Sequence, residues 1–247
     1  MHPVLLATIV GLVAGVAGTG LGGAGAAALV RPKRNVLSSA LGFSAGAMVA
    51  ILAFSLIPQA LKVGGLMWTV AGLLAGVGLV SIIDLVVPHV HAFSGDRESA
   101  RFLATGAVIG LGIALHNLPE GMAIGAAYAR GAGPGLAVAV AIALQNVPEG
   151  VAMGLPLVAG RVKPLRVVGA TLLAGLPMGV GGTLGAALGS LSPATLAVAL
   201  GLAAGAMLFI TGDELMPAAH EMGRGHQAAF GFVAGVIVGI VTLSWLG

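Results

Sequence analysis

The fold is decided by residues 41–60, which read LGFSAGAMVAILAFSLIPQA and carry no charged side chain. An α-helix needs about 20 apolar residues to cross a hydrocarbon core of about 30 Å. The stretch is also rich in glycine and alanine, which let neighbouring membrane helices approach closely. It therefore predicts a transmembrane helix packed against other helices.

The composition extends this prediction to the whole chain of 247 residues. Hydrophobic residues make up 58%, charged residues 8%, and the mean hydropathy is +1.08, which together exclude a soluble domain. There are no cysteines, so disulfides and thiolate metal ligands are excluded. We expect one all-α polytopic membrane domain over residues 1–247, with eight helices at about 3–30, 37–61, 66–88, 102–129, 134–159, 166–190, 195–218 and 227–246.

A second stretch, residues 200–219, repeats the first as LGLAAGAMLFITGDELMPAA. Methionine and proline match in place, Met48 with Met207 and Pro58 with Pro217, so duplication is favoured over shared low complexity. The stretches are the second and seventh predicted helices, so they cross the bilayer in opposite directions. This predicts a 3+2+3 arrangement, in which helices 1–3 and 6–8 form inverted repeats around helices 4 and 5. Inverted repeats are typical of alternating-access transporters.

The basic residues predict the orientation. All Lys and Arg except Lys62 and Arg130 fall in or beside predicted loops on one side of the membrane. The positive-inside rule places these loops in the cytoplasm and both termini outside it, in a multi-pass protein of the cell (inner) membrane. The pI of about 10.0 reflects these loops and indicates no nucleic-acid partner.

Two copies of a polar motif interrupt the fourth and fifth predicted helices. One reads HNLPEG from His116, and the other reads QNVPEG from Gln145. In each copy the glutamate, Glu120 or Glu149, lies four residues after the first residue of the motif and therefore on the same helix face. A proline before each glutamate removes a backbone hydrogen bond. Each copy thus offers nitrogen or oxygen donors one turn apart, an arrangement suited to a divalent cation.

These four side chains are predicted to form the inner shell of one metal site. An ionised carboxylate at the bilayer centre costs about 2.5 kcal/mol or more, and no Lys or Arg lies within these two helices to offset it. An acid held neutral by a proton is the alternative, but the imidazole and amides at matched positions favour a cation. Imidazole with carboxylates suits Zn²⁺, and also Fe²⁺, Mn²⁺ or Cd²⁺. Met48 is a further candidate ligand, with ordinary core packing as the alternative.

Other polar residues of the apolar segments are assigned to a secondary metal site or to the ion pathway. Asn117 and Asn146 lie about 100° round their helices from the first residue of each motif, where they would hold water or a second ion. The rest lie toward the predicted cytoplasmic ends of the third and seventh helices, where a solvated helix end is the alternative: Asp84, His89, His91, Asp213 and Glu214.

The paired HNLPEG and QNVPEG motifs, with VPHVH at the end of the third predicted helix, resemble those of the ZIP family of divalent-metal transporters, and of its bacterial GufA-like branch in particular. The resemblance implies a transporter, not an enzyme, that brings Zn²⁺ into the cytoplasm and also accepts Fe²⁺, Mn²⁺, Co²⁺ or Cd²⁺. It implies a homodimer in which helices 1, 4, 5 and 6 move as an elevator against the other four. It implies no cofactor, only the metal as cargo, and a primary site made of His116, Glu120, Gln145, Glu149 and Met48.

Two departures from the family pattern predict a single transported ion per protomer. Members with a two-metal centre carry an acid where this chain has Asn146, and a glutamate where it has Leu176 before Pro177. Two alternatives stay open at this point: a membrane-embedded metal-dependent hydrolase, and a proton-coupled carrier of an organic solute. A hydrolase would need an open metal position and a general base, and the sequence holds no HExxH.

Overall fold

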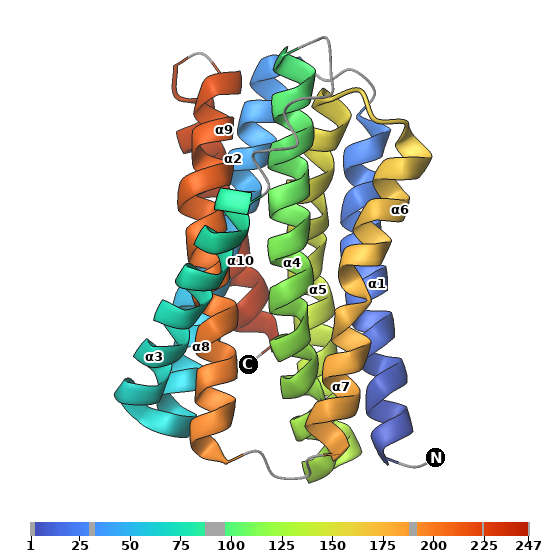
Figure 1. Cartoon of the computed structure of the whole chain (residues 1–247), viewed down its shortest axis with the longest axis vertical. Coiled ribbons are helices and arrows are strands. Elements are labelled where there is room, and N and C mark those ends of the chain that lie inside the picture. The colour runs from blue at the N-terminus through green and yellow to red at the C-terminus, as the bar shows by residue number, and fades with distance from the viewer. Residues whose placement is uncertain (1–2, 30–32, 87–96, 188–191, 224, 247) are drawn as a thin grey trace.

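The chain folds into a bundle of helices that run roughly along one axis (Figure 1). The computed structural model describes residues 3–29, 33–86, 97–187, 192–223 and 225–246, and every regular element among them is a helix. Seven helical segments of this described part are long and apolar enough to cross a membrane. The chain is therefore an all-helical polytopic membrane protein, as the composition predicted.

The helices follow the predicted apolar segments, with several internal divisions. They are α1 (Pro3–Ala28), α2 (Arg34–Ile51), η1 (Leu52–Leu56), α3 (Ile57–Val86), α4 (Arg97–Arg130), α5 (Ala132–Ala159), α6 (Pro164–Gly175), α7 (Pro177–Ala187), α8 (Pro193–Phe209), η3 (Ile210–Leu215), α9 (Met216–Met222) and α10 (Gln227–Leu246). The helix predicted from residue 102 begins earlier, at Arg97, because a polar first turn extends it beyond the apolar segment.

Glycine and proline account for two breaks, one within α3 and one between α6 and α7. The apolar stretch from Arg34 to Ile82 has 49 residues and, at about 1.5 Å per residue, is far longer than a bilayer core of about 30 Å. It is broken at Gly65, between the helices predicted at 37–61 and 66–88, and the φ of 79° at this residue is readily adopted only by glycine. The segment predicted at 166–190 is divided at Pro177, which cannot donate a backbone hydrogen bond.

The two stretches predicted to be duplicated share an unusual backbone feature. Each contains a π-helical turn, η1 in the first and η3 in the second, and each turn ends two residues before the matched proline, Pro58 or Pro217. π-Helical residues make up well under about 1% of soluble globular proteins. The equivalence of the two stretches thus extends from residue type to backbone conformation.

The helices pack in two groups. One group consists of α1, α4, α5, α6 and α7, and the other of α2, α3, α8, α9 and α10 with η1 and η3. Figure 1 shows the first group on the right of the bundle and the second on the left. A buried aliphatic cluster, which includes Met48, Ile113, Met153, Met207 and Ile210, joins the two.

Glycines bring helix backbones together within each group. A Cβ on Gly76 of α3 would collide with the carbonyl oxygen of Leu202 of α8, and one on Gly235 of α10 with that of Phe43 of α2. The two contacts are equivalent between the predicted repeats. Among the described glycines, the contact that crosses between the groups is with a side chain, that of Ile210. The close backbone contacts at glycines therefore occur within each helix group and not between the groups.

Candidate metal centre

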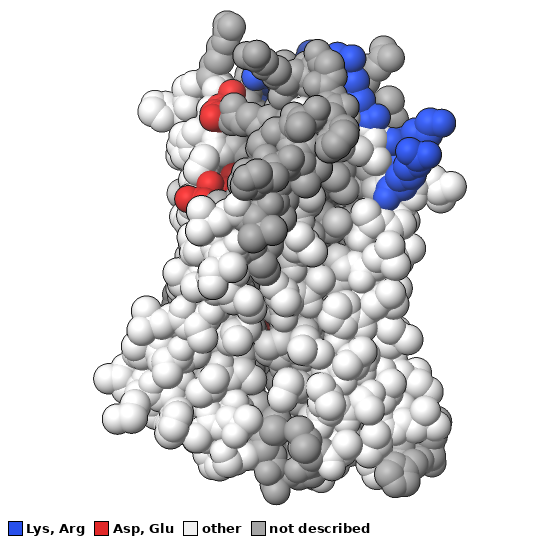
Figure 2. All heavy atoms as spheres, viewed as in Figure 1, with Lys and Arg blue, Asp and Glu red and all other residues white. Residues whose placement is uncertain are grey.

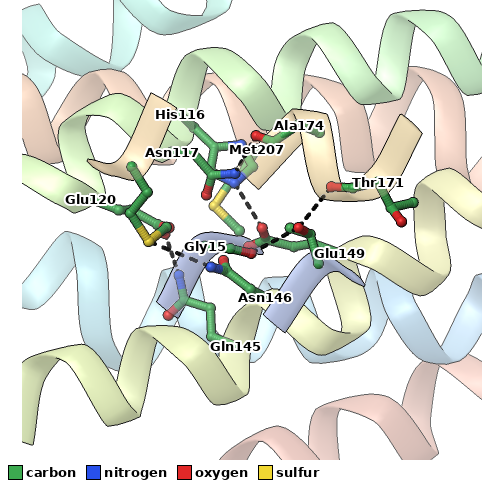
Figure 3. Close-up of polar contacts among 12 residues, drawn as sticks. Gly15, His116, Asn117, Glu120, Gln145, Asn146, Glu149, Thr171, Ala174 and Met207 are labelled. Carbon is green, nitrogen blue, oxygen red and sulfur yellow. Dashed lines mark hydrogen bonds and ion pairs between the residues drawn. The ribbon is translucent and has the colours of Figure 1, made fainter. Parts of the chain in front are cut away.

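The two polar motifs meet inside the first helix group, each near the middle of its helix. Figure 3 shows their side chains pointing toward one another from α4 and α5. Gln145 is 8% exposed, and the other five polar side chains are completely buried: His116, Asn117, Glu120, Asn146 and Glu149. Such burial of ionisable groups is rare unless they are paired or bind a cation.

The direct contacts join side chains of different helices, not side chains of the same helix. His116 Nε2 lies 2.9 Å from Glu149 Oε2, and the Gln145 amide donates a hydrogen bond to Glu120 Oε1. Residues predicted to share a helix face, such as His116 and Glu120, do come to one centre, but each takes its direct partner from the other motif. The centre is therefore one site built from both copies.

The ligand atoms of this centre are close enough to surround an ion. His116, Glu120 and Glu149 each offer one ligand atom, and these atoms all lie within 4.8 Å of one another. Zinc lies about 2.0–2.2 Å from nitrogen and carboxylate oxygen, so small side-chain rotations would bring all three onto one ion. These three residues are the only group of three or more His, Asp or Glu side chains found at metal-binding distance in the described part of the chain.

The same residues carry polar atoms without a partner. His116 Nδ1, Glu120 Oε2 and Glu149 Oε1 are buried and make no hydrogen bond. Leaving one buried polar atom unsatisfied costs about 1–3 kcal/mol. Three such atoms in one small centre indicate a missing binding partner, and a divalent cation fits the donor set of imidazole and carboxylates.

Comparison with known proteins shows the family of this chain. A family model for ZIP zinc transporters matches residues 92–247. The chain belongs to the ZIP family. It is 34% identical over 243 residues to the zinc transporter ZupT of Corynebacterium aurimucosum, with 92% of each chain covered. It is 34% identical over 254 residues to ZupT of Corynebacterium glutamicum, covering 94% of this chain and 95% of the relative. With ZupT of Clostridium perfringens it shares 29% over 278 residues, covering 98% and 96%.

The predicted family is thereby confirmed, and the GufA-like branch stays a prediction. This ZIP-family chain belongs to a family of transporters and is not an enzyme, so the hydrolase alternative is dropped.

In this ZIP-family chain the two motif asparagines hold helices together, a role that the sequence did not predict. Asn117 Nδ2 donates to the Ala174 carbonyl at 2.8 Å, next to the break between α6 and α7. Asn146 Nδ2 makes a longer contact of 3.5 Å with the Ala14 carbonyl of α1 and lies 3.6 Å from Met178 Sδ. The Oδ1 atoms of both asparagines are buried without a partner, so their assignment to a secondary site stays a prediction.

A threonine supports the same region and was missed. Thr19 Oγ1 lies 2.8 Å from both the Gly15 and the Thr171 carbonyl oxygens, which share its one proton, and so it ties α1 to α6. Thr171 and Ala174 lie in the last turns of α6, before the break at Pro177. Backbone carbonyls leave no signal in the sequence, and only the glycine-rich surroundings of Thr19 pointed to a close helix contact.

Gln145 connects the site with the boundary between the helix groups. It lines a cavity of about 260 Å³ between α2, α5 and α10. Most of the lining is apolar, including Phe43, Ile51 and Leu144. Among the six polar motif side chains, Gln145 is also the only one that is not completely buried.

The remaining predicted site residues are placed as follows. Met48 is completely buried in the cluster between the helix groups, and its thioether stays a predicted ligand. Figure 3 draws its repeat counterpart, Met207, in the same close-up as the site. Asp213 is exposed and Glu214 is half-buried on η3, apart from the buried centre. Asp84 lies on α3, but its side chain is outside the described part of the structure. His89 and His91 lie outside the described residues.

Proposed function

We propose that the chain carries divalent transition-metal cations, Zn²⁺ above all, across the cell (inner) membrane into the cytoplasm. The observation that carries this proposal is the buried group of His116, Glu120 and Glu149, whose ligand atoms lie within 4.8 Å. Its relatives are named zinc transporters. Fe²⁺, Mn²⁺, Co²⁺ and Cd²⁺ suit the same donors.

The donor set combines strong binding with release. Two carboxylates balance the charge of a divalent ion, which reduces the cost of holding it within the bilayer. The imidazole of His116 adds a strong ligand, and the Gln145 amide adds a weak one at the exposed edge of the site. We assign Met48 as a soft fifth donor. Asn146 and Leu176 replace the acids of a two-metal centre, so one ion occupies each protomer.

The proposed architecture is eight crossings in a 3+2+3 arrangement, with the chain reversing at Gly65. Equivalent contacts of the first three and last three crossings support the inverted repeat. Gly22 of α1 packs on the Val147 carbonyl of the second motif, and Gly181 of α7 packs on the Leu118 carbonyl of the first motif. The matched π-helical turns of the second and seventh crossings support it further.

The proposed mechanism is an elevator. Close backbone contacts at glycines hold each of the two helix groups together, whereas aliphatic side chains fill the boundary between the groups. Dispersion contacts between such side chains are individually weak and non-directional, so the groups can slide without breaking a backbone hydrogen bond. The group without site residues is proposed to be held by a partner copy in a homodimer.

The orientation is proposed from charge. Figure 2 shows Lys and Arg gathered at one end of the molecule, while the long middle of this face carries neither sign of charge. The positive-inside rule assigns the basic end to the cytoplasm and both termini to the opposite side.

Uptake into proteoliposomes tests the proposal. Wild-type protein is loaded with external Zn²⁺ in the presence of Fe²⁺, Mn²⁺, Co²⁺ or Cd²⁺, with and without a pH gradient. We expect saturable Zn²⁺ entry that the other ions reduce by competition. The alternative of an organic-solute carrier predicts no heat of Zn²⁺ binding in isothermal titration calorimetry, and that result would replace our proposal.

A further inference from the structure

The connection between α5 and α6 carries an unpaired cluster of positive charge. Residues 160–166 read GRVKPLR, and Arg161, Lys163 and Arg166 are all exposed. In the part of the chain that the structure describes, none of the three forms an ion pair. Figure 2 shows positive spheres at the end of the molecule where α6 begins. Three cations within six residues are thus free to bind an anion.

Arg161 occupies a backbone position that favours glycine. Its φ of 62° is the only positive φ found for a non-glycine residue among the described residues. The Val162 amide donates to the Leu157 carbonyl at 3.0 Å, which closes the end of α5 around this left-handed residue. Glycine would adopt this conformation without strain. An arginine at a backbone position that disfavours it suggests a use for its side chain.

The neighbouring residues suit a membrane surface. Leu165 lies between Lys163 and Arg166 and is 83% exposed. α6 starts at Pro164 and has no side-chain cap at Lys163, so the positive end of the helix dipole also faces this region. A large apolar side chain beside cations, at the end of membrane-spanning helices, fits the boundary between acyl chains and phosphates.

We propose that the 160–166 connection binds the phosphate headgroup of an anionic phospholipid. Arg161, Lys163 and Arg166 contact the phosphate, and Leu165 enters the acyl region of the same leaflet. Charge complementarity and the exposed leucine together select a lipid over a soluble anion. The same connection joins α5, which carries Gln145 and Glu149, to α6. Headgroup binding therefore anchors the helix group that holds the metal site.

Lipid retention tests the binding. The full chain is placed in phosphatidylcholine nanodiscs with rising phosphatidylglycerol, and bound phosphatidylglycerol is counted by native mass spectrometry after mild release. Each Lys or Arg near an anionic surface is worth about 1 kcal/mol, or about fivefold in affinity. We expect roughly a fivefold loss in Arg161→Gly and a larger loss when Lys163 and Arg166 are also changed to Gln.

The controls separate charge from fold. Arg161→Gly relieves the strained backbone, so its thermal stability should be kept or raised while lipid binding falls. Lys62→Gln removes one positive charge at the opposite end of the molecule and should leave retention unchanged. Equal retention in wild type and Arg161→Gly overturns the proposal. Displacement of the lipid by millimolar inorganic phosphate overturns the assignment to a lipid headgroup.

The effect on uptake rests on the proposed transport function. We expect the Zn²⁺ uptake rate of wild type to change with the phosphatidylglycerol fraction, and that of Arg161→Gly to change less. Equal lipid dependence of uptake in both proteins overturns the anchoring role. Absence of Zn²⁺ uptake in every lipid contradicts the transport function alone, because the retention measurement detects binding without transport.

Discussion

The close approach of α3 and α8 predicts opposite effects for two glycines of the same helix. In Gly76→Ala, the new methyl carbon would lie 2.8 Å from the Ala206 nitrogen and closer still to the Leu202 oxygen. In Gly78→Ala, nothing lies within 4 Å of it. Overpacking costs about 1–3 kcal/mol, whereas replacing a helical glycine by alanine gains about 1 kcal/mol. We therefore expect Gly78→Ala to be slightly stabilised and Gly76→Ala to be about 1–3 kcal/mol less stable than it.

The equivalent glycine of the second repeat gives an internal check. A methyl carbon on Gly235 of α10 would lie 2.8 Å from the Ala47 nitrogen, the same distance as for Gly76. The free energy of unfolding is measured by circular dichroism during titration with dodecyl sulfate, in one lipid–detergent mixture. Gly76→Ala and Gly235→Ala should then lose similar amounts. The reasoning is refuted when Gly76→Ala is as stable as Gly78→Ala.

Three further predictions concern the site. His116→Ala should weaken Zn²⁺ binding more than about tenfold, since even outer-shell partners of a ligand are worth about 10- to 100-fold, and Gln145→Ala should weaken it less; calorimetry that ranks them the other way contradicts the ligand assignment. Zn²⁺ affinity should fall as pH is lowered, because imidazole and carboxylates must be deprotonated to bind; equilibrium dialysis across acidic and neutral pH checks this, and a constant affinity argues against these ligands. Asn117→Ala should lower the unfolding free energy by about 1–3 kcal/mol through the unpaired Ala174 carbonyl; unchanged stability in the dodecyl sulfate titration means that the bond contributes nothing.

Most of the helical architecture could be predicted, because length and hydropathy report directly whether a segment can cross a bilayer. The break at Pro177 within the segment predicted at 166–190 and the π-helical turns were harder. The break at Gly65 was expected, because it falls between the helices predicted at 37–61 and 66–88, and its φ of 79° locates it at one residue. The π-helical turns arise from local backbone packing, which apolar composition does not record. Pro119 and Pro148 lie within continuous helices, whereas Pro177 divides one, so proline alone did not locate the break.

The candidate site was predicted in its residue types but not in its pairing. Helical spacing placed His116 and Glu120 on one helix face, and the structure brings both side chains to one centre. The direct partner of His116 is Glu149, and this depends on how α4 and α5 are rotated and aligned, which the sequence does not encode locally. The asparagine contacts with backbone carbonyls have the same origin. The pairing of side chains therefore depends on how helices distant in sequence are aligned, and residue spacing within one helix does not report it.

The central claim is that Zn²⁺ crosses the membrane through the centre formed by α4 and α5. The most direct measurement is the initial rate of Zn²⁺ uptake into proteoliposomes, compared between wild type and the double variant His116→Ala, Glu149→Ala at equal amounts of folded protein. We predict saturable uptake by wild type and a rate at the level of empty liposomes for the double variant. Uptake by the double variant at the wild-type rate would contradict the claim.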